Sequence, residues 1–174
     1  MADVLNPVSF NKICSAWYGE NEKSVVLPSD EQGYNDCMSW QLSVLGAVSL
    51  STTEITLHPE RKTVALLTYL ALEGPTPRSK LAGLLWPDSG ESNARSNLRQ
   101  LLSRLKKSIG AELVIPEEIL RLQGLEVDAA RLKVLAFSSS DEILQLSGEL
   151  LSPYDYDDCP DFADWLLSER ERIE

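Results

Sequence analysis

The sequence predicts an α+β fold in which short strands are followed by three helices and then by a hairpin. Residues 40–57 contain three short runs of β type separated by turn residues. Residues 60–109 change to helical spacing, with two breaks at Gly/Pro positions. Residues 113–122 are two apolar runs joined by a Pro-Glu-Glu turn. Strands, three helices and a hairpin, in this order, make a winged helix.

The first element is a small antiparallel sheet formed by residues 40–44, 47–50 and 53–57. The first and third runs alternate between apolar and polar residues, as half-buried strands do. Residues 1–38 precede this sheet, mix polar, Gly and Pro residues with scattered aromatics, and keep no period. We therefore treat 1–38 as an N-terminal extension of unknown role and begin the winged helix at residue 39.

Two helices follow the sheet. The first is expected over 60–72 and ends before Gly74-Pro75, with one apolar stripe formed by Val64, Leu67, Leu70 and Ala71. The second is expected over 79–86, with Ser79 as its N-cap, and ends at Pro87. It is expected to bury Leu81, Leu84 and Leu85, with Trp86 as a core anchor.

The third helix, expected over 92–109 with Ser92 as N-cap and Gly110 as the residue that ends it, is strongly amphipathic. At 100° per residue its apolar residues fall on about one third of the circumference. They are Ala94, Leu98, Leu101, Leu102, Leu105 and Ile109. The opposite arc is polar and cationic: Arg95, Ser96, Arg99, Gln100, Ser103, Arg104, Lys106 and Lys107. By itself this arc is equally typical of a solvated surface helix with extra arginines.

A hairpin over 113–115 and 119–122 completes the winged helix at residue 123. Beyond Gly124, three more helices are expected, near 127–137, 141–146 and 160–173. The last has an apolar side with nothing after it in the sequence to bury it fully, so we expect this side to be exposed. The side consists of Phe162, Trp165, Leu166 and Ile173.

The net charge of −11 hides one basic block. Residues 60–110 carry nine Lys or Arg and four Asp or Glu, whereas 1–59 carry two against seven and 111–174 carry five against sixteen. Affinity for DNA of any sequence comes from cations that neutralise phosphates. The basic block, rather than the average charge, therefore indicates the partner.

Other classes of protein lack support in the sequence. Three cysteines and the single His58 are too few for a disulfide framework or a zinc site, so no metal is expected. The acidic residues of 154–158 lack the glycine and distal Glu of a calcium loop and indicate an exposed loop. With no enzyme motif, no cofactor motif and no apolar run long enough to span a bilayer, we expect a soluble, cytoplasmic protein that is not an enzyme.

Several motifs in one order point to a known family. They are ERKTVALL at 60–67, LAGLLWPD at 81–88, ARSNLRQLLSRLKK at 94–107, VD at 127–128, GELL at 148–151, and the helix at 162–173. Over roughly residues 40–174 the sequence resembles the antibiotic regulatory protein (SARP) family of bacterial activators. The resemblance implies an OmpR-type winged helix over 39–123, and over 124–174 the start of a bacterial transcriptional activation domain, which is tetratricopeptide-like and here truncated. The sequence departs from the family in two respects. Its wing turn carries Glu117 and Glu118, which repel phosphate, and the activation domain of the family normally runs through several more helical repeats.

The resemblance implies binding to double-stranded DNA at a direct-repeat operator, by a homo-dimer that forms on the DNA, with RNA polymerase as a candidate partner. The third helix would lie in the major groove. Its base-reading residues would be Ser96, Asn97, Arg99, Gln100 and Ser103, because Arg pairs with guanine and Gln with adenine. Its phosphate-binding residues would be Arg61, Lys62, Arg78, Lys80, Arg95, Arg104, Lys106 and Lys107.

The competing interpretation is a protein-interaction module. In it, the winged helix and the helical segment serve assembly, and the acidic wing and tail exclude DNA.

Overall fold

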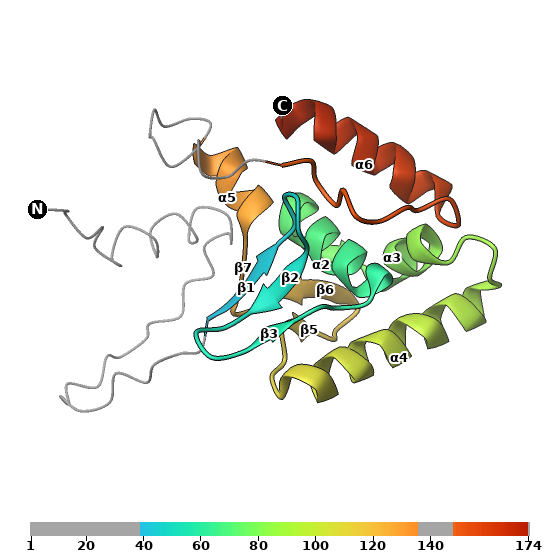
Figure 1. Cartoon of the computed structure of the whole chain (residues 1–174). Coiled ribbons are helices and arrows are strands. Elements are labelled where there is room, and N and C mark those ends of the chain that lie inside the picture. Colours follow the sequence, from blue (N-terminus) through green and yellow to red (C-terminus); the bar gives the residue numbers. More distant parts are fainter. Residues whose placement is uncertain (1–38, 136–147, 174) are drawn as a thin grey trace, which may run out of the picture. The chain divides into compact units, whose positions relative to one another are not determined.

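The computed structural model describes residues 39–135 and 148–173. The extension at 1–38 and the helix expected at 141–146 lie outside the described residues. Figure 1 shows the elements in chain order. They are β1 (Trp40–Ser43), β2 (Ser49–Ser51), β3 (Thr56–Leu57), α2 (Arg61–Glu73), β4 (Thr76–Pro77), α3 (Arg78–Leu85), α4 (Glu91–Ile109), β5 (Val114–Ile115), β6 (Ile119–Leu122), β7 (Leu125–Val127), α5 (Asp128–Leu135) and α6 (Pro160–Ile173). The predicted order of strands, three helices and a hairpin is confirmed.

The first sheet has one strand more than the sequence predicted. Its order is β3-β2-β1-β7, and β7 runs parallel to β1, with Leu42 opposite Val127. We expected a helix to begin at Val127, but the helix begins one residue later. The carboxylate of Asp128 fixes this join, because it accepts hydrogen bonds from the backbone N–H groups of Val44 and Leu45 at 3.0 and 3.2 Å.

The second sheet is the wing. Its order is β4-β6-β5, so the predicted hairpin is joined by β4, a two-residue strand that the sequence did not predict. Thr76 lies opposite Leu120, and Pro77 opposite Ile119. A proline lacks the N–H of a ladder hydrogen bond and is tolerated at a sheet edge, which is where β4 lies.

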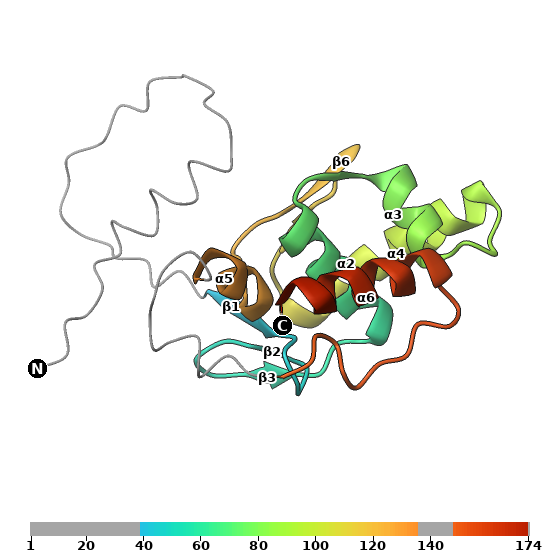
Figure 2. The same ribbon diagram turned by 90° about the horizontal axis from the view of Figure 1, so that it is seen from above.

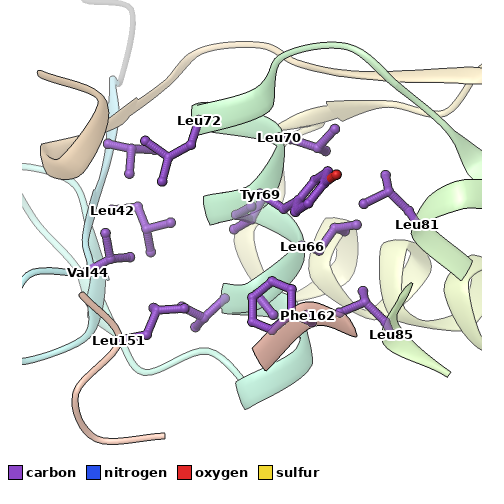
Figure 3. Packing of buried hydrophobic residues seen from close by; sticks show 14 of the residues in the cluster. Leu42, Val44, Leu66, Tyr69, Leu70, Leu72, Leu81, Leu85, Leu151 and Phe162 are labelled. Atoms are coloured by element: carbon purple, nitrogen blue, oxygen red, sulfur yellow. The ribbon is translucent and has the colours of Figure 1, made fainter. Parts of the chain in front are cut away.

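Helix α2 is the centre of the hydrophobic core (Figure 3). Every residue from Thr63 to Leu70 is buried, so the single apolar stripe that we predicted is too narrow. Contacts with α3, α4, α5 and β6 surround the helix. In α3, Leu81 and Leu85 are buried as expected, whereas Leu84 and the residue that follows the helix, Trp86, are only partly buried.

The predicted N-caps are wrong. Helix α3 begins at Arg78 after Pro77, and α4 begins at Glu91 after Gly90, and neither helix has a side-chain cap. In α4 the backbone carbonyl of Gly90 accepts the N–H groups of Asn93 and Ala94, so the first turn closes without Ser92 as its cap. The expected end of α4 is confirmed, since Gly110 adopts the left-handed conformation at φ 66°.

Helix α6 packs on the winged helix, which corrects the expectation of an exposed apolar side. Phe162 and Leu166 are buried, and Trp165, half-buried, contacts Tyr69 of α2 with 4.7 Å between ring centroids. Figure 2, seen from above, shows α6 lying across α2. The residues before α6 follow a path along the core, and Leu151 donates a backbone hydrogen bond to Val44 at 2.8 Å. This path places the apolar side of α6 against α2 and α3.

Truncation of Phe162 tests this packing. The side chain is fully buried, so Phe162→Ala should lower the free energy of unfolding by about 3–5 kcal/mol. Urea unfolding followed by circular dichroism measures the change. The matched control on the same helix is Leu167→Ala, which removes a side chain that is 56% exposed and should change stability by less than about 0.5 kcal/mol. Equal effects of the two substitutions would contradict the packing.

Candidate nucleic-acid interface

Helix α4 has one buried face and one solvent-facing arc, as its periodicity predicted. Ala94, Leu98, Leu101 and Leu105 are buried in the core, and α3 is the main neighbour of the helix. On the opposite arc, Arg99, Gln100, Ser103 and Lys107 are exposed, whereas Ser96 and Asn97 are half-buried. Within the described ranges no other helix covers this arc (Figure 1). Long polar side chains are therefore presented outward along several turns of a rigid helix.

The cations of α4 differ in their partners. The Arg99 guanidinium donates to the Ser96 hydroxyl at 3.4 Å, and neither Arg99 nor Lys107 forms an ion pair with any residue that the structure describes. The other three cations are paired: Arg95 with Glu91 at 2.6 Å, Arg104 with Glu60 at 3.3 Å, and Lys106 with Glu112 at 2.9 Å. These pairs are exposed, and pairs of this kind contribute about 0–1 kcal/mol. A phosphate can therefore replace the carboxylate at low cost.

A hollow of about 280 Å³ lies between α4 and the wing. It brings together four of the predicted site residues, Arg78, Arg99, Ser103 and Lys106. Arg78 holds the wing turn from the start of α3, because its guanidinium donates to the carbonyl of Pro116 at 3.1 Å and its backbone N–H donates to that of Glu118 at 3.0 Å. The wing turn is thus fixed to the start of α3.

The tip of the wing is acidic and exposed. Glu117 and Glu118 are both solvent-exposed, and Ile119 beside them is 41% exposed. A phosphate at this tip would meet two carboxylates and no cation from the turn itself. Contacts between the wing and an anion are therefore favoured near Arg78 rather than at the tip.

Two predicted phosphate-binding cations instead bind the loop before α6. The Asp158 carboxylate pairs with Arg61 at 2.7 Å and with Lys62 at 2.9 Å. Arg61 also donates to the Asp155 carbonyl, and the Tyr156 hydroxyl donates to the Arg61 carbonyl at 3.1 Å. The structure therefore places Arg61 and Lys62 on the side of α2 that holds this loop, apart from the hollow.

Lys80 also lies apart from the hollow. Its ammonium group lies 5.5 Å from the ring centroid of Tyr69, which contacts Trp165 of α6. A hydrogen bond with Tyr69 raises the pKa of Lys80, and the charge of Tyr69 acts in the same direction. The phosphate-binding role of Lys80, like those of Arg61 and Lys62, stays a prediction, and contacts within the chain compete with it.

Sequence reasoning missed the ion pairs of Asp158, because we expected this residue in an exposed loop. Burial by itself raises the pKa of Asp158, but the hydrogen bonds and charges of Lys62 and Arg61 outweigh burial and hold the pKa below its ordinary value of 3.8. Next to it, the Cys159 thiol is buried and donates to the Leu85 carbonyl at 3.2 Å, and burial raises its pKa. No local pattern signals these contacts, because their partners lie far away in the sequence.

The described helices include none that is both long and apolar enough to cross a membrane. In the same part of the chain, no group of three or more His, Cys, Asp or Glu side chains could hold a metal ion.

Comparison with known proteins shows the fold alone. No protein-family model matches the sequence, and no curated protein matches it. Among solved structures, the chain is similar to Mycobacterium tuberculosis EmbR in complex with a low-affinity phosphopeptide, at 17% identity and a TM-score of 0.54. The match covers 78% of this chain and 43% of the EmbR chain. The chain thus has an EmbR-like α+β fold, with N-terminal strands followed by helices, and spans less than half of the length of that protein.

The ion pairs of Asp158 predict a dependence of stability on pH. Because the pKa of Asp158 is lower in the folded chain, its contribution is present above the unfolded value of 3.8 and is lost as the pH falls through the folded value. Asp158→Asn should lower the free energy of unfolding at pH 7 by less than about 1 kcal/mol, because the pairs are partly exposed. The difference from the unsubstituted chain should shrink on acidification.

Urea unfolding at pH 7 and pH 3 measures this difference. The matched control is Asp164→Asn on α6, whose exposed side chain has no ion pair within the described residues. A penalty for Asp158→Asn that is the same at both pH values would contradict the assignment.

Proposed function

We propose that this chain is a sequence-specific regulator of transcription, an activator of the SARP type, that binds double-stranded DNA with α4 in the major groove. One observation carries the proposal: α4 buries its leucine face in the core and leaves a polar, cationic arc uncovered by the described residues. An α-helix fits the major groove and can reach base edges there. The likeness to EmbR supports a fold like that of the SARP family.

We assign base reading to the residues at the centre of the polar arc of α4. Arg99 can pair with guanine through two N–H groups, and Gln100 can pair with adenine in the same bidentate way. Both side chains are exposed, and neither is held by an ion pair in the part of the chain that the structure describes. Ser96, Asn97 and Ser103 each lie within one helical turn of Arg99 or Gln100 and complete the base-reading set.

We assign phosphate binding to the cations on and beside this arc. Lys107 is without an ion pair among the described residues, and the exposed pairs of Arg95, Arg104 and Lys106 can open at low cost. Arg78 adds a cation from the start of α3. Such contacts set the register of the protein on DNA and make affinity depend on salt.

The operator is proposed to be a direct repeat that binds two copies of the chain head to tail, with half-sites about one helical turn apart. One recognition helix contacts too few base pairs to be selective by itself. Contact with RNA polymerase is proposed as the step by which the bound protein activates transcription.

A protein-assembly module is the second candidate, favoured by the acidic wing tip and the net charge of −11. Selection of bound sequences from random duplex DNA, followed by titration at two salt concentrations, separates the two functions. An enriched repeat whose affinity falls with salt supports DNA binding. Absence of binding to any duplex at low salt supports assembly.

Substitution of Arg99 tests base reading. Arg99→Ala removes a bidentate donor that lysine cannot replace in geometry, so it should weaken binding to the preferred site by about 1–3 kcal/mol and relax the choice of one base pair. Fluorescence anisotropy on the preferred site and on its single-base variants measures both effects. Unchanged base preference in a folded variant would mean that this arc is only a solvated surface.

Substitution of Lys107 is the contrasting test on the same helix. Lys107→Ala should weaken binding to all sequences nearly equally and reduce the salt dependence by roughly one phosphate. Leu98→Ala controls for the fold, because Leu98 is fully buried and its truncation should cost about 2–5 kcal/mol of stability. A shift in base preference on Lys107→Ala would contradict this division.

A further inference from the structure

The hollow between α4 and the wing combines an apolar floor with a cationic rim. Its apolar lining residues, which we call the floor, are Leu102, Leu105, Leu113, Val114 and Pro116. Its polar and charged lining residues, which we call the rim, are Arg78, Arg99, Ser103, Lys106 and Glu112. A ligand that fits this surface has an apolar part bonded directly to an anionic part.

The rim can bind an anion although it contains a carboxylate. Three cations and Glu112 leave a net charge of two positive units, and Glu112 is already paired with Lys106 at 2.9 Å. A guanidinium has five N–H donors, and Pro116 occupies one donor of Arg78. The described residues offer no partner for the remaining donors of Arg78. These donors are therefore available to an oxyanion.

Size and position narrow the ligand further. At about 280 Å³ the hollow lies at the small end of the range for ligand sites, which measure about 300–1,000 Å³. It opens beside Arg99 and Ser103, which belong to the arc proposed to read bases. A DNA strand that borders the major groove therefore passes this opening. Its repeating unit is a sugar ring next to a phosphate, which matches the apolar floor and the cationic rim.

We propose that this hollow is a seat for one sugar–phosphate unit of the DNA backbone. The inference rests on the proposed function and names the chemistry of one part of that interface. Arg78 and Lys106 hold the phosphate from opposite sides, the Ser103 hydroxyl donates to it, and the sugar packs on the leucines. Because Arg78 also holds the Pro116 carbonyl, the wing contacts DNA next to Pro116. Glu117 and Glu118 at the wing tip stay away from phosphate.

The test uses the full chain and an operator selected from random duplex DNA, in which single phosphates are replaced one at a time by neutral methylphosphonates. Binding of the unsubstituted chain should fall about tenfold at the seated phosphate, as expected for the loss of a hydrogen-bonded charge. Lys106→Ala should bind more weakly and should respond clearly less to neutralisation of that phosphate, because only Arg78 and Ser103 remain to hold it. Arg78→Lys keeps the positive charge but loses the planar guanidinium that can donate two parallel hydrogen bonds. Its response to neutralisation of that phosphate should be intermediate.

Lys107→Ala is the matched control, because Lys107 is the next residue of α4 and does not line the hollow. It should keep the full response at the seated phosphate and lose the response at a different one. If Lys106→Ala and Arg78→Lys, folded by circular dichroism, respond to every neutralisation as the unsubstituted chain does, the seat is wrong while DNA binding stands. Absence of binding to any duplex by the unsubstituted chain would overturn both proposals.

Discussion

The burial of α2 on all its sides is the constraint on which the other elements depend. A helix with one apolar stripe packs on one neighbour, whereas residues 63–70 are buried without interruption. The first sheet, α3, α4 and α6 therefore each pack on the 13 residues of α2 (Figure 3). The orientation of α4 follows from this arrangement, because its leucines have a single surface to cover and its polar arc must then face outward. The proposed interface is thus a product of the core.

The basic block of residues 60–110 does not form one cationic surface. Arg61 and Lys62 are both paired with Asp158, whereas Arg78, Arg99, Lys106 and Lys107 are on or beside α4. The number of charges that can meet phosphate is therefore smaller than the sequence suggests. Carboxylates also limit the interface at its two flanks, at the wing tip and near Glu60. The proposed DNA-binding surface therefore depends on a few well-placed contacts rather than on a wide positive field.

The segment around α6 stabilises the domain from the side away from the wing. Aromatic contacts join Tyr156, Phe162, Trp165 and Tyr69, and the Trp165 indole donates to the Glu73 carboxylate at 2.9 Å. Together with the Asp158 ion pairs, they fasten residues 154–173 along α2. Within the described residues, this helical segment packs on the winged helix, and it does so through the apolar side that was expected to be exposed. Its helical-repeat character stays a prediction.

The sequence by itself determined the order of three strands, three helices and a hairpin, though not the short strands β4 and β7. It also determined which face of α4 is buried, because leucines repeated at helical spacing over 19 residues are a strong local signal. It also located the hairpin and the Gly110 helix end. Only the tertiary structure decided that β7 extends the first sheet, that α6 covers α2 and that Asp158 takes two cations from the basic block. Each of these contacts joins residues far apart in the chain, and short strands or single charged residues carry too little pattern to specify their partners. The path of the folded backbone brings them together, and that path depends on the whole core at once.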